Sequence, residues 1–361
     1  MMIADKGILS DTQISQLFRY KNIVTEQDLE TNQIQPASLD LRLGKTAWRV
    51  RASFLPGKQY QVFQKLNRFL LHQFDLTEGA VLEKDCVYIV QLIENLCLPQ
   101  DVSASANPKS STGRLDIFTR LITDYAQQFD IVPEGYKGPL YLEISPLTFP
   151  IIVRTESRLS QIRFRRGIAT LSYEEMLSLQ NHEILVAKEE VNIDNSGVAI
   201  SIDMNANQEG LIGYRGKRHT VAIDVDKKGF YNPLDFWEPL FNKGVDNLIL
   251  DPDEFYILVS CEFVHIPPNY AAEMVPFDPF IGEFRVHYAG FFDPGFGNVS
   301  SGGARAVLEV RSHKVPFILE HGQIVGHLIY EQMLERPNTV YGAEMNSHYQ
   351  GQSLKLSKHF R

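Results

Sequence analysis

The sequence predicts a mainly β protein that contains two related modules and a few short helices. Short apolar runs recur along the chain, for example at 87–93, 120–125, 139–145 and 149–153. Proline, glycine and asparagine separate these runs. Short strands divided by regular turns are typical of β-barrels and sandwiches, whereas parallel α/β folds alternate strands with long helices.

The second half of the chain repeats the order of the first half. Residues 138–164 and 304–330 both read as strand, glutamate, strand, polar turn and strand. Residues 96–108 and 262–276 form a second similar pair. An internal repeat outweighs local propensity in predicting a fold. We therefore expect two modules, at 1–172 and 173–361, that arose by duplication.

Local patterns place several elements. Ser10 or Asp11 can cap a helix whose apolar residues recur at helical spacing, and 173–182 reads as a short helix near the junction of the modules. Alternation in SLDLRLG predicts a strand that ends at Gly44. Residues 57–76 are poorly patterned and are interpreted as an insertion.

Composition narrows the class of protein and the range of its partners. The 361 residues are 44% hydrophobic and 22% charged, with a net charge of −9, which suits a globular chain and disfavours a general nucleic-acid binder. No stretch approaches the roughly 18 apolar residues of a membrane span. The start of the chain does not resemble a secretory signal, and the three cysteines are widely separated. We expect a cytoplasmic protein with no membrane partner.

The stretch 286–311 presents a carboxylate beside a turn. It reads as a strand, a turn at Asp293-Pro294-Gly295, a Gly/Ser loop and a returning strand. In the returning strand, side chains alternate, so Glu309 lies on the face opposite Leu308. A lone strand glutamate is usually a solvated side chain, but the adjoining turn makes Glu309 a candidate catalytic group.

The segment 107–114, NPKSSTGR, combines neighbouring hydroxyls, two cations and a glycine. Such a turn can bind an anion through backbone and side-chain donors, or it can be a polar turn whose serines cap the next segment. The matching segment 275–284 has neither a hydroxyl pair nor an arginine. The matching segment 123–143 keeps Glu143 but has no Asp-Pro-Gly turn.

The C-terminal tail lacks periodicity and is predicted to be mobile. It contains groups that can stack on a ligand or hydrogen-bond to it, so a lid that closes over a phosphorylated ligand is a second interpretation. These groups are Tyr341, His348, Tyr349, Gln352 and Lys355.

Several motifs of other chemistries are missing from the sequence. We find no dinucleotide fingerprint, no Walker-type loop and no zinc-deaminase signature. The cysteines do not have the spacing of metal ligands. Hydrolysis without protein-bound zinc is therefore expected, with no metal-ligating residues in the protein.

Taken together, these motifs resemble the dCTP deaminase family, which has a dUTPase-like β-fold. The family's PAS-x-DLRLG segment matches 36–44, and its RSS-x-x-R loop matches 109–114 with Lys109 in place of the leading arginine. Its TAG-x-x-DPGF hairpin and the LE strand that follows match 288–296 and Leu308-Glu309. Its YQGQ tail matches 349–352. The motifs cover most of the chain but are divided between two fused modules, each expected to be a dUTPase-like β-barrel or jelly roll.

The resemblance implies hydrolytic deamination of dCTP to dUTP and ammonia. Glu309 would act as the base, Arg114 and Ser111 would hold the water and stabilise charge, and Glu143 is the alternative base. Mg²⁺ would accompany the triphosphate. The implied substrate-binding residues are Lys109, Ser110, Tyr288, Ala289, Gly290, Asp293, Tyr341, Tyr349, Gln352 and Lys355.

Alternatives remain open at this point. A dUTP diphosphatase or a bifunctional enzyme that yields dUMP would use the same fold, and a non-catalytic nucleotide-binding regulatory module is a further possibility. In the family, sites form between neighbouring modules, so a homo-oligomer with composite sites is expected. Feedback by dTTP is implied by the resemblance alone.

Overall fold

The computed structural model of the chain is mainly β, with few helices, as predicted. It describes residues 5–187, 191–205, 210–242, 244, 247–276, 284–287, 290–297, 302–312, 314–342 and 351–361, with backbone alone at 276 and 284–287. The chain divides into two compact units. Unit 1 contains residues 1–169, 219–228 and 333–338, and unit 2 contains 170–218, 229–332 and 339–361. The predicted boundary between residues 172 and 173 does not allow for residues 219–228 and 333–338, which follow this boundary but belong to unit 1.

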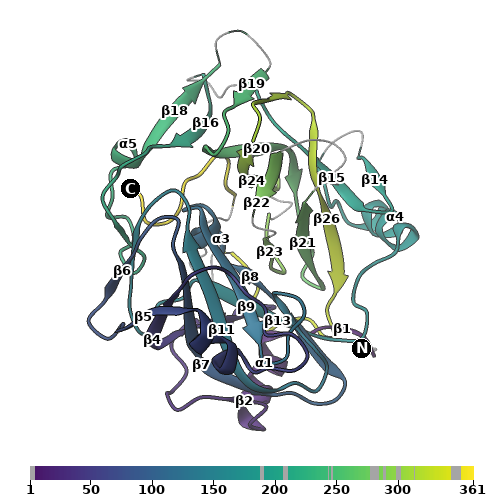
Figure 1. Cartoon of the computed structure of the whole chain (residues 1–361). Coiled ribbons are helices and arrows are strands. Elements are labelled where there is room, and N and C mark those ends of the chain that lie inside the picture. Colours follow the sequence, from purple (N-terminus) through teal and green to yellow (C-terminus); the bar gives the residue numbers. More distant parts are fainter. Residues whose placement is uncertain are drawn as a thin grey trace. The chain divides into compact units, whose positions relative to one another are not determined.

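The described residues of unit 1 form three sheets and three helices. Figure 1 labels several of these elements. The β13 sheet runs β1 (Gly7–Ile8), β13 (Ser160–Arg166), β8 (Val102–Pro108), β10 (Ile131–Val132), with β3 (Leu39–Leu41) also paired to β13. The β11 sheet runs β5 (Leu70–Asp75), β4 (Leu43–Val50), β7 (Val87–Cys97), β11 (Lys137–Pro146), β9 (Ile117–Thr123), with β2 (Ile23–Val24) beside β7. The β12 sheet runs β17 (Ile223–Asp224), β12 (Ile151–Val153), β6 (Ala80–Leu82). The helices are α1 (Asp11–Arg19), α2 (Val62–Phe69) and α3 (Ser110–Gly113).

Unit 2 also contains three sheets in its described residues. The β26 sheet runs β14 (Ile193–Asp194), β15 (Gly197–Ser201), β26 (Ile324–Gln332), β21 (Tyr270–Pro276), β23 (Phe291–Phe292). The β24 sheet runs β18 (Trp237–Phe241), β16 (Leu211–Gly216), β20 (Phe255–Val264), β24 (Ala304–Ser312), β22 (Phe284–His287). The β25 sheet pairs β19 (Asn247–Leu250) with β25 (Phe317–Glu320). The helices are α4 (Tyr173–His182) and α5 (Pro233–Phe236).

The two units share one strand order. The path β4-β7-β11-β9 of unit 1 corresponds to β16-β20-β24-β22 of unit 2. Likewise, β3-β13-β8-β10 corresponds to β15-β26-β21-β23, and β6-β12 corresponds to β19-β25. The strand registers therefore identify matching residues in the two units, such as Glu143 with Glu309.

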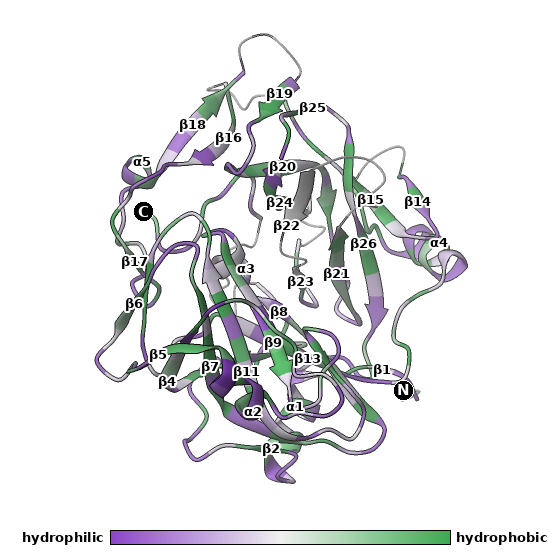
Figure 2. Ribbon diagram, viewed as in Figure 1, coloured by the Kyte–Doolittle hydropathy of each residue, from purple (hydrophilic) through white to green (hydrophobic). Residues whose placement is uncertain are grey.

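Apolar faces of both major sheets form the core of unit 2. One buried cluster contains Val198 and Leu328 from the β26 sheet and Leu258 and Leu308 from the β24 sheet. Along β26, hydrophobic residues occupy most of the strand and hydrophilic residues occupy its C-terminal end (Figure 2). Burial of these faces stabilises the unit, because about 25 cal/mol is gained per Å² of apolar surface removed from water.

Several local predictions can be compared with the structure. Ser10 caps α1 with a reciprocal capping box, and α4 covers the predicted 173–182 helix. Two predictions were wrong. The strand does not end at Gly44, because β4 continues through this residue. Residues 57–76 are not an irregular insertion, because they contain α2 and β5, and β5 pairs with β4 at the edge of the β11 sheet. Among the helices of the described residues, none has the length and apolar character needed to span a membrane.

Candidate active site

The Lys109–Arg114 turn follows directly from the end of β8. The backbone N–H groups of Thr112 and Gly113 donate to the Lys109 carbonyl at 2.8 and 2.9 Å, which closes the single turn of α3. The side chains of Ser111 and Arg114 are buried, at 5% and 3% exposure. Unit 1 thus brings Lys109, Ser110, Ser111 and Arg114 together in one tight turn.

Asp40 holds the Lys109 end of this turn. It lies on β3, which pairs with β13, and β13 in turn places Ser160 opposite Pro108 just before the turn. The Lys109 ammonium forms an ion pair with Asp40, and Arg158 lies 3.6 Å from the same carboxylate oxygen. Lys109, predicted to bind substrate, is therefore also a partner of Asp40. Sequence reasoning did not identify Asp40 because the pair joins distant segments.

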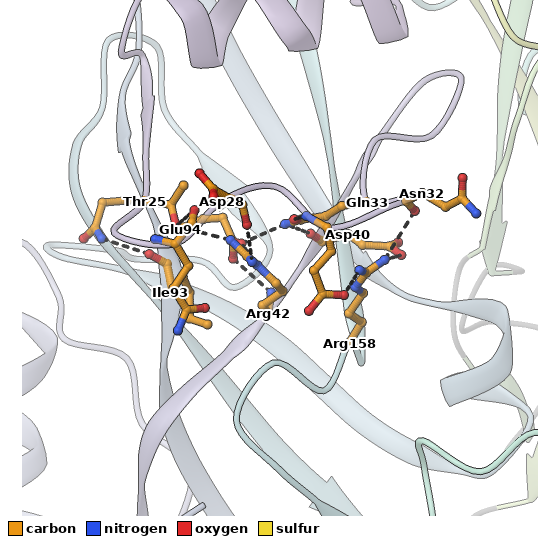
Figure 3. Close-up of polar contacts among 12 residues, drawn as sticks. Thr25, Asp28, Asn32, Gln33, Asp40, Arg42, Ile93, Glu94 and Arg158 are labelled. Carbon is orange, nitrogen blue, oxygen red and sulfur yellow. Dashed lines mark hydrogen bonds and ion pairs between the residues drawn. The ribbon is translucent and has the colours of Figure 1, made fainter. Parts of the chain in front are cut away.

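A buried network fixes the neighbouring Arg42 (Figure 3). Glu94 Oε1 accepts from Arg42 Nε at 2.8 Å and from Gln33 Nε2 at 2.8 Å, and Oε2 accepts from the Arg42 backbone N–H at 2.9 Å. Both charged side chains are fully buried. Within the 36–44 segment, Arg42 and Asp40 thus have structural partners: Arg42 attaches it to β7, and Asp40 attaches it to the Lys109–Arg114 turn.

Glu309 lies in the middle of β24 in unit 2. Its ladder partners are Ile257 on β20 and His287 on β22. Leu308 and Val310 belong to the core cluster, so Glu309 is on the other face of the strand, as the alternation predicts. The side chain is 7% exposed. A carboxylate is thus buried on a rigid strand outside the apolar core.

The Asp293–Phe296 turn is attached to the other major sheet of unit 2. It follows β23, which pairs with β21, and the Gly295 N–H donates to the Ile266 carbonyl at 2.9 Å. Gly295 has φ +92°, and an added Cβ would lie 2.9 Å from the Tyr341 carbonyl oxygen. Glycine is required here because side chains rarely adopt this backbone conformation and a backbone neighbour fills the space.

Tyr341 supports this turn. Its N–H donates to the Pro294 carbonyl at 2.7 Å, and its ring centroid lies 5.7 Å from that of Phe296. Two predicted substrate-binding residues of unit 2, Asp293 and Tyr341, therefore lie at the same turn. Gly290 precedes it, and the Gly290 carbonyl accepts from the Met274 N–H at 3.0 Å.

The end of the tail is packed, so the prediction that it is mobile was wrong for 351–361. The Gln352 side chain donates to the Arg305 carbonyl at 3.1 Å, and the Arg305 N–H donates to the Gln352 carbonyl at 3.0 Å. Phe360 is buried against the rings of Tyr231 and Trp237, which outweighs the polar composition of the segment. Lys355 remains exposed. Tyr288, Ala289, His348 and Tyr349 lie outside the described residues.

Glu143, the alternative base, forms an ion pair with an arginine. Its Oε1 accepts from Arg120 Nε at 2.9 Å and from Arg120 Nη2 at 2.5 Å, and the carboxylate is 1% exposed. The guanidinium also lies 3.6 Å from the centroid of the Phe129 ring. Arg120 is the ladder partner of Glu143, in the position that His287 has beside Glu309. Only the strand register could have identified Arg120.

The face of β11 that holds Glu143 is also covered. Ile89, its other ladder partner, belongs to a buried cluster with Val62 and Leu66 of α2. Tyr141 lies on the same face, and burial raises its pKa to about 12, so the phenol stays protonated at neutral pH. The side of β11 that carries Glu143 is therefore packed against α2.

Comparison with known proteins identifies the family. The family models for the N-terminal and C-terminal domains of 2′-deoxycytidine 5′-triphosphate deaminase match residues 5–168 and 172–360. The crystal structure of 2′-deoxycytidine 5′-triphosphate deaminase from Agrobacterium tumefaciens is 64% identical to this chain. It has a TM-score of 0.89, and the match covers 93% of this chain and 100% of that chain.

Curated relatives match a smaller part of the chain. A dUMP-forming dCTP deaminase from Methanosphaera stadtmanae is 28% identical over 173 residues, covering 44% of this chain and 78% of the relative. A dCTP deaminase from Haloarcula marismortui is 29% identical over 171 residues, covering 44% and 79%. The chain belongs to the dCTP deaminase family, and it is an enzyme of the hydrolase class.

Proposed function

We propose that this enzyme hydrolyses dCTP to dUTP and ammonia and that Glu309 is the general base. The observation that supports Glu309 most strongly is the state of its counterpart. Glu143 forms a buried ion pair with Arg120 on a face packed against α2, and a carboxylate held in this way is not available to water and substrate. Glu309 is buried on the face of β24 outside the apolar core, in the unit that holds the Asp293–Phe296 turn.

The proposed reaction balances without an external acid. Glu309 removes a proton from water as the oxygen bonds to C4 of cytosine, and it passes this proton to N3 of the ring. Glu309 then takes the remaining proton from the C4 hydroxyl and gives it to the amine, so that the C4–N bond breaks, ammonia leaves and the C4 carbonyl forms. A positioned base of this kind contributes typically about 10²–10⁴-fold to a rate.

Other predicted residues take supporting roles in this proposal. Ser111 and Arg114 would hold the water and stabilise the charge that develops in the intermediate. Lys109, Ser110, Gln352 and Lys355 would bind the triphosphate of Mg²⁺-bound dCTP. In the base and sugar region, Asp293 would accept a hydrogen bond from the sugar 3′-hydroxyl, and the backbone at Gly290 would read the base.

The architecture and assembly complete the proposal. Each unit would be a dUTPase-like barrel or jelly roll, and the shared strand order supports an origin by duplication. We propose a homo-oligomer that dTTP inhibits. Mixing Glu309→Gln with Arg114→Ala chains tests whether one site uses two copies, since only a shared site would recover activity.

A second candidate reaction ends at dUMP. It is favoured by the name of the Methanosphaera relative, a dUMP-forming dCTP deaminase, and Asp293 could then position the water that attacks phosphate. The Agrobacterium structure, which matches nearly the whole chain, is described as a deaminase without mention of dUMP. We therefore favour dUTP as the product.

Product analysis tests the proposal. The purified protein is incubated with dCTP and Mg²⁺, nucleotides are separated by chromatography, and ammonia is measured in parallel. We expect ammonia and dUTP in equal amounts. Ammonia with dUMP and pyrophosphate would replace the first candidate by the second, and unchanged dCTP would contradict both.

A further inference from the structure

Three potential metal ligands of unit 2 lie close together, away from Glu309 in sequence. Asp203 follows β15, Cys261 lies in β20, and His321 lies in the turn after β25. One ligand atom from each lies within 4.8 Å of the others. We propose that Asp203, Cys261 and His321 form a binding site for a divalent cation of the zinc class.

The distances suit a tetrahedral ion. Asp203 Oδ1 lies 3.5 Å and Cys261 Sγ lies 4.0 Å from His321 Nδ1. Zinc bonds of about 2.0–2.1 Å to nitrogen or oxygen and about 2.3 Å to sulfur place tetrahedral ligand atoms roughly 3.4–3.7 Å apart. Since all three ligand atoms lie within 4.8 Å of one another, movements of up to about 1 Å would complete three bonds and leave the fourth position to water.

The histidine has the tautomer that a metal requires. The Met204 N–H donates to His321 Nδ1 at 3.2 Å, so this nitrogen carries a lone pair. The other ring nitrogen, Nε2, then carries the proton and lies 3.2 Å from Asn205 Nδ2, so the Asn205 amide would have to turn its oxygen toward this nitrogen to accept from it. Ligating histidines are usually oriented by an acceptor at the second nitrogen. Metal binding would exchange the Met204 hydrogen bond for a bond to the ion.

The charges of the cluster also fit a cation. The Asp203 carboxylate is 6% exposed, and its other oxygen, Oδ2, is paired with Arg305, so Oδ1 faces the cluster. Cys261 Sγ donates to the Ile202 carbonyl at 3.1 Å as a thiol. On binding, the thiol would release its proton and ligate as thiolate. A thiolate, an imidazole and a carboxylate are ligands that zinc accepts.

Unit 1 provides an internal comparison. The backbone of Leu43 hydrogen-bonds to Ser157 and Glu156, and the backbone of Ile202 hydrogen-bonds in the same way to Gln323 and Gly322. Leu43 is therefore equivalent to Ile202. By this alignment Gly44 matches Asp203, and Thr155 matches His321. Ile93 matches Cys261, because each precedes a matching glutamate. Glu94 accepts from the Arg42 backbone N–H, and Glu262 accepts from the Ser201 backbone N–H. None of Gly44, Ile93 and Thr155 is a usual zinc ligand.

The proposal leaves the chemistry at Glu309 unchanged. The expectation of no metal-ligating residues in the protein does not allow for the Asp203–Cys261–His321 cluster, which consists of residues other than those proposed to act at the reacting water. Sequence spacing did not indicate this cluster because Cys261 and His321 are 60 residues apart and meet only through strand pairing.

Metal binding to the full chain, prepared without a histidine tag, tests the proposal. Zn²⁺ uptake is measured by equilibrium dialysis, and Co²⁺ is used as a spectroscopic probe of thiolate ligation. We expect one ion per chain, a sulfur-to-cobalt charge-transfer band, and a higher melting temperature with Zn²⁺. Cys261→Ser should abolish the band, and both Cys261→Ser and His321→Asn should weaken Zn²⁺ binding at least about tenfold.

Matched controls separate this site from other thiols and from the carboxylate at Glu309. Cys97→Ser removes a thiol of unit 1, and Glu309→Gln changes the proposed base. Both should bind like the wild-type chain. His321 is 35% exposed, so His321→Asn should keep the fold, which circular dichroism would verify. Absence of stoichiometric Zn²⁺ binding by the wild type, or equal affinity in His321→Asn, would overturn the proposal.

Discussion

Two glutamates occupy the same place in the two units and have different surroundings. Glu143 in β11 and Glu309 in β24 each lie in the middle of a central strand, opposite Ile89 and Ile257 on one side. On the other side, the ladder partner of Glu143 is Arg120 and the ladder partner of Glu309 is His287. The comparison shows that two carboxylates at the same strand position have different ladder partners. The proposal accordingly assigns a structural ion pair to Glu143 and the role of base to Glu309.

A similar contrast exists at a second pair of glutamates. Glu94 accepts a hydrogen bond from the Arg42 side chain. Its counterpart Glu262 accepts from the Ser201 N–H at 2.8 Å and from the Ser201 hydroxyl at 2.7 Å. Where unit 1 holds the arginine, unit 2 has a cavity of about 160 Å³ lined in part by Ser201 and Glu262. The two copies therefore hold the matching glutamate with different residues of the preceding strand region.

The largest expected effect on stability is at this second pair. Glu94→Gln leaves Arg42 buried without its charged partner, which should cost about 3–5 kcal/mol of unfolding free energy. Glu262→Gln keeps an acceptor for Ser201 and should cost about 1 kcal/mol. Hydrogen exchange of the backbone amides in β7 and in β20 measures the loss of stability in unit 1 and in unit 2 separately. Equal losses in both variants would contradict the comparison.

The two turns give the next effect. Gly295→Ala forces a side chain into a left-handed conformation and against the Tyr341 backbone, so it should cost about 3 kcal/mol. Its counterpart Gly135, at φ +67°, meets only the end of the Gln100 side chain, so Gly135→Ala should cost about 1 kcal/mol. Thermal unfolding of both variants measures this difference. A larger loss for Gly135→Ala would show that Tyr341 does not support the turn.

The Arg120–Glu143 pair gives an intermediate effect. Glu143→Gln removes the charge that the guanidinium binds, and the expected loss is about 2 kcal/mol, because hydrogen bonds to charged groups are worth about 1.5–3 kcal/mol. Urea unfolding followed by Trp48 fluorescence, in the same sheet, measures it. A stability equal to that of the wild type would mean that Arg120 does not depend on Glu143.

The smallest effect concerns a strand that only unit 1 has among the described residues. β17 pairs with β12, and the Arg154 guanidinium binds Asp224 through both oxygens at 2.7 and 2.8 Å. This contact lowers the pKa of Asp224. The pair therefore stabilises the fold above the unfolded-state pKa of about 3.9, and the contribution is lost as pH falls through the lower folded-state pKa.

Asp224→Asn should accordingly cost about 1 kcal/mol at pH 7, a modest amount because Arg154 is partly exposed. The difference from the wild type should shrink below about pH 4. Melting temperatures measured across this range provide the test. A difference that grows as the pH falls would show that another group is responsible.

The sequence predicted what periodicity and local motifs encode. Alternation placed Glu309 opposite the apolar face, the capping pattern placed α1, and the helical reading of 173–182 placed α4. It did not predict the partners that depend on strand register, namely Arg120 on Glu143 and Asp40 on Lys109. The packed tail was missed for a related reason: the aromatic contacts of Phe360 join it to Tyr231 and Trp237, which are distant in sequence.

The most direct test of the account compares Glu309→Gln with Glu143→Gln in ammonia release from dCTP at saturating Mg²⁺. We expect Glu309→Gln to lower kcat by about 10²–10⁴-fold while circular dichroism stays unchanged. Glu143→Gln, once folded, should release ammonia at close to the wild-type rate. A wild-type rate in Glu309→Gln together with an inactive, folded Glu143→Gln would contradict the account and assign the base to unit 1.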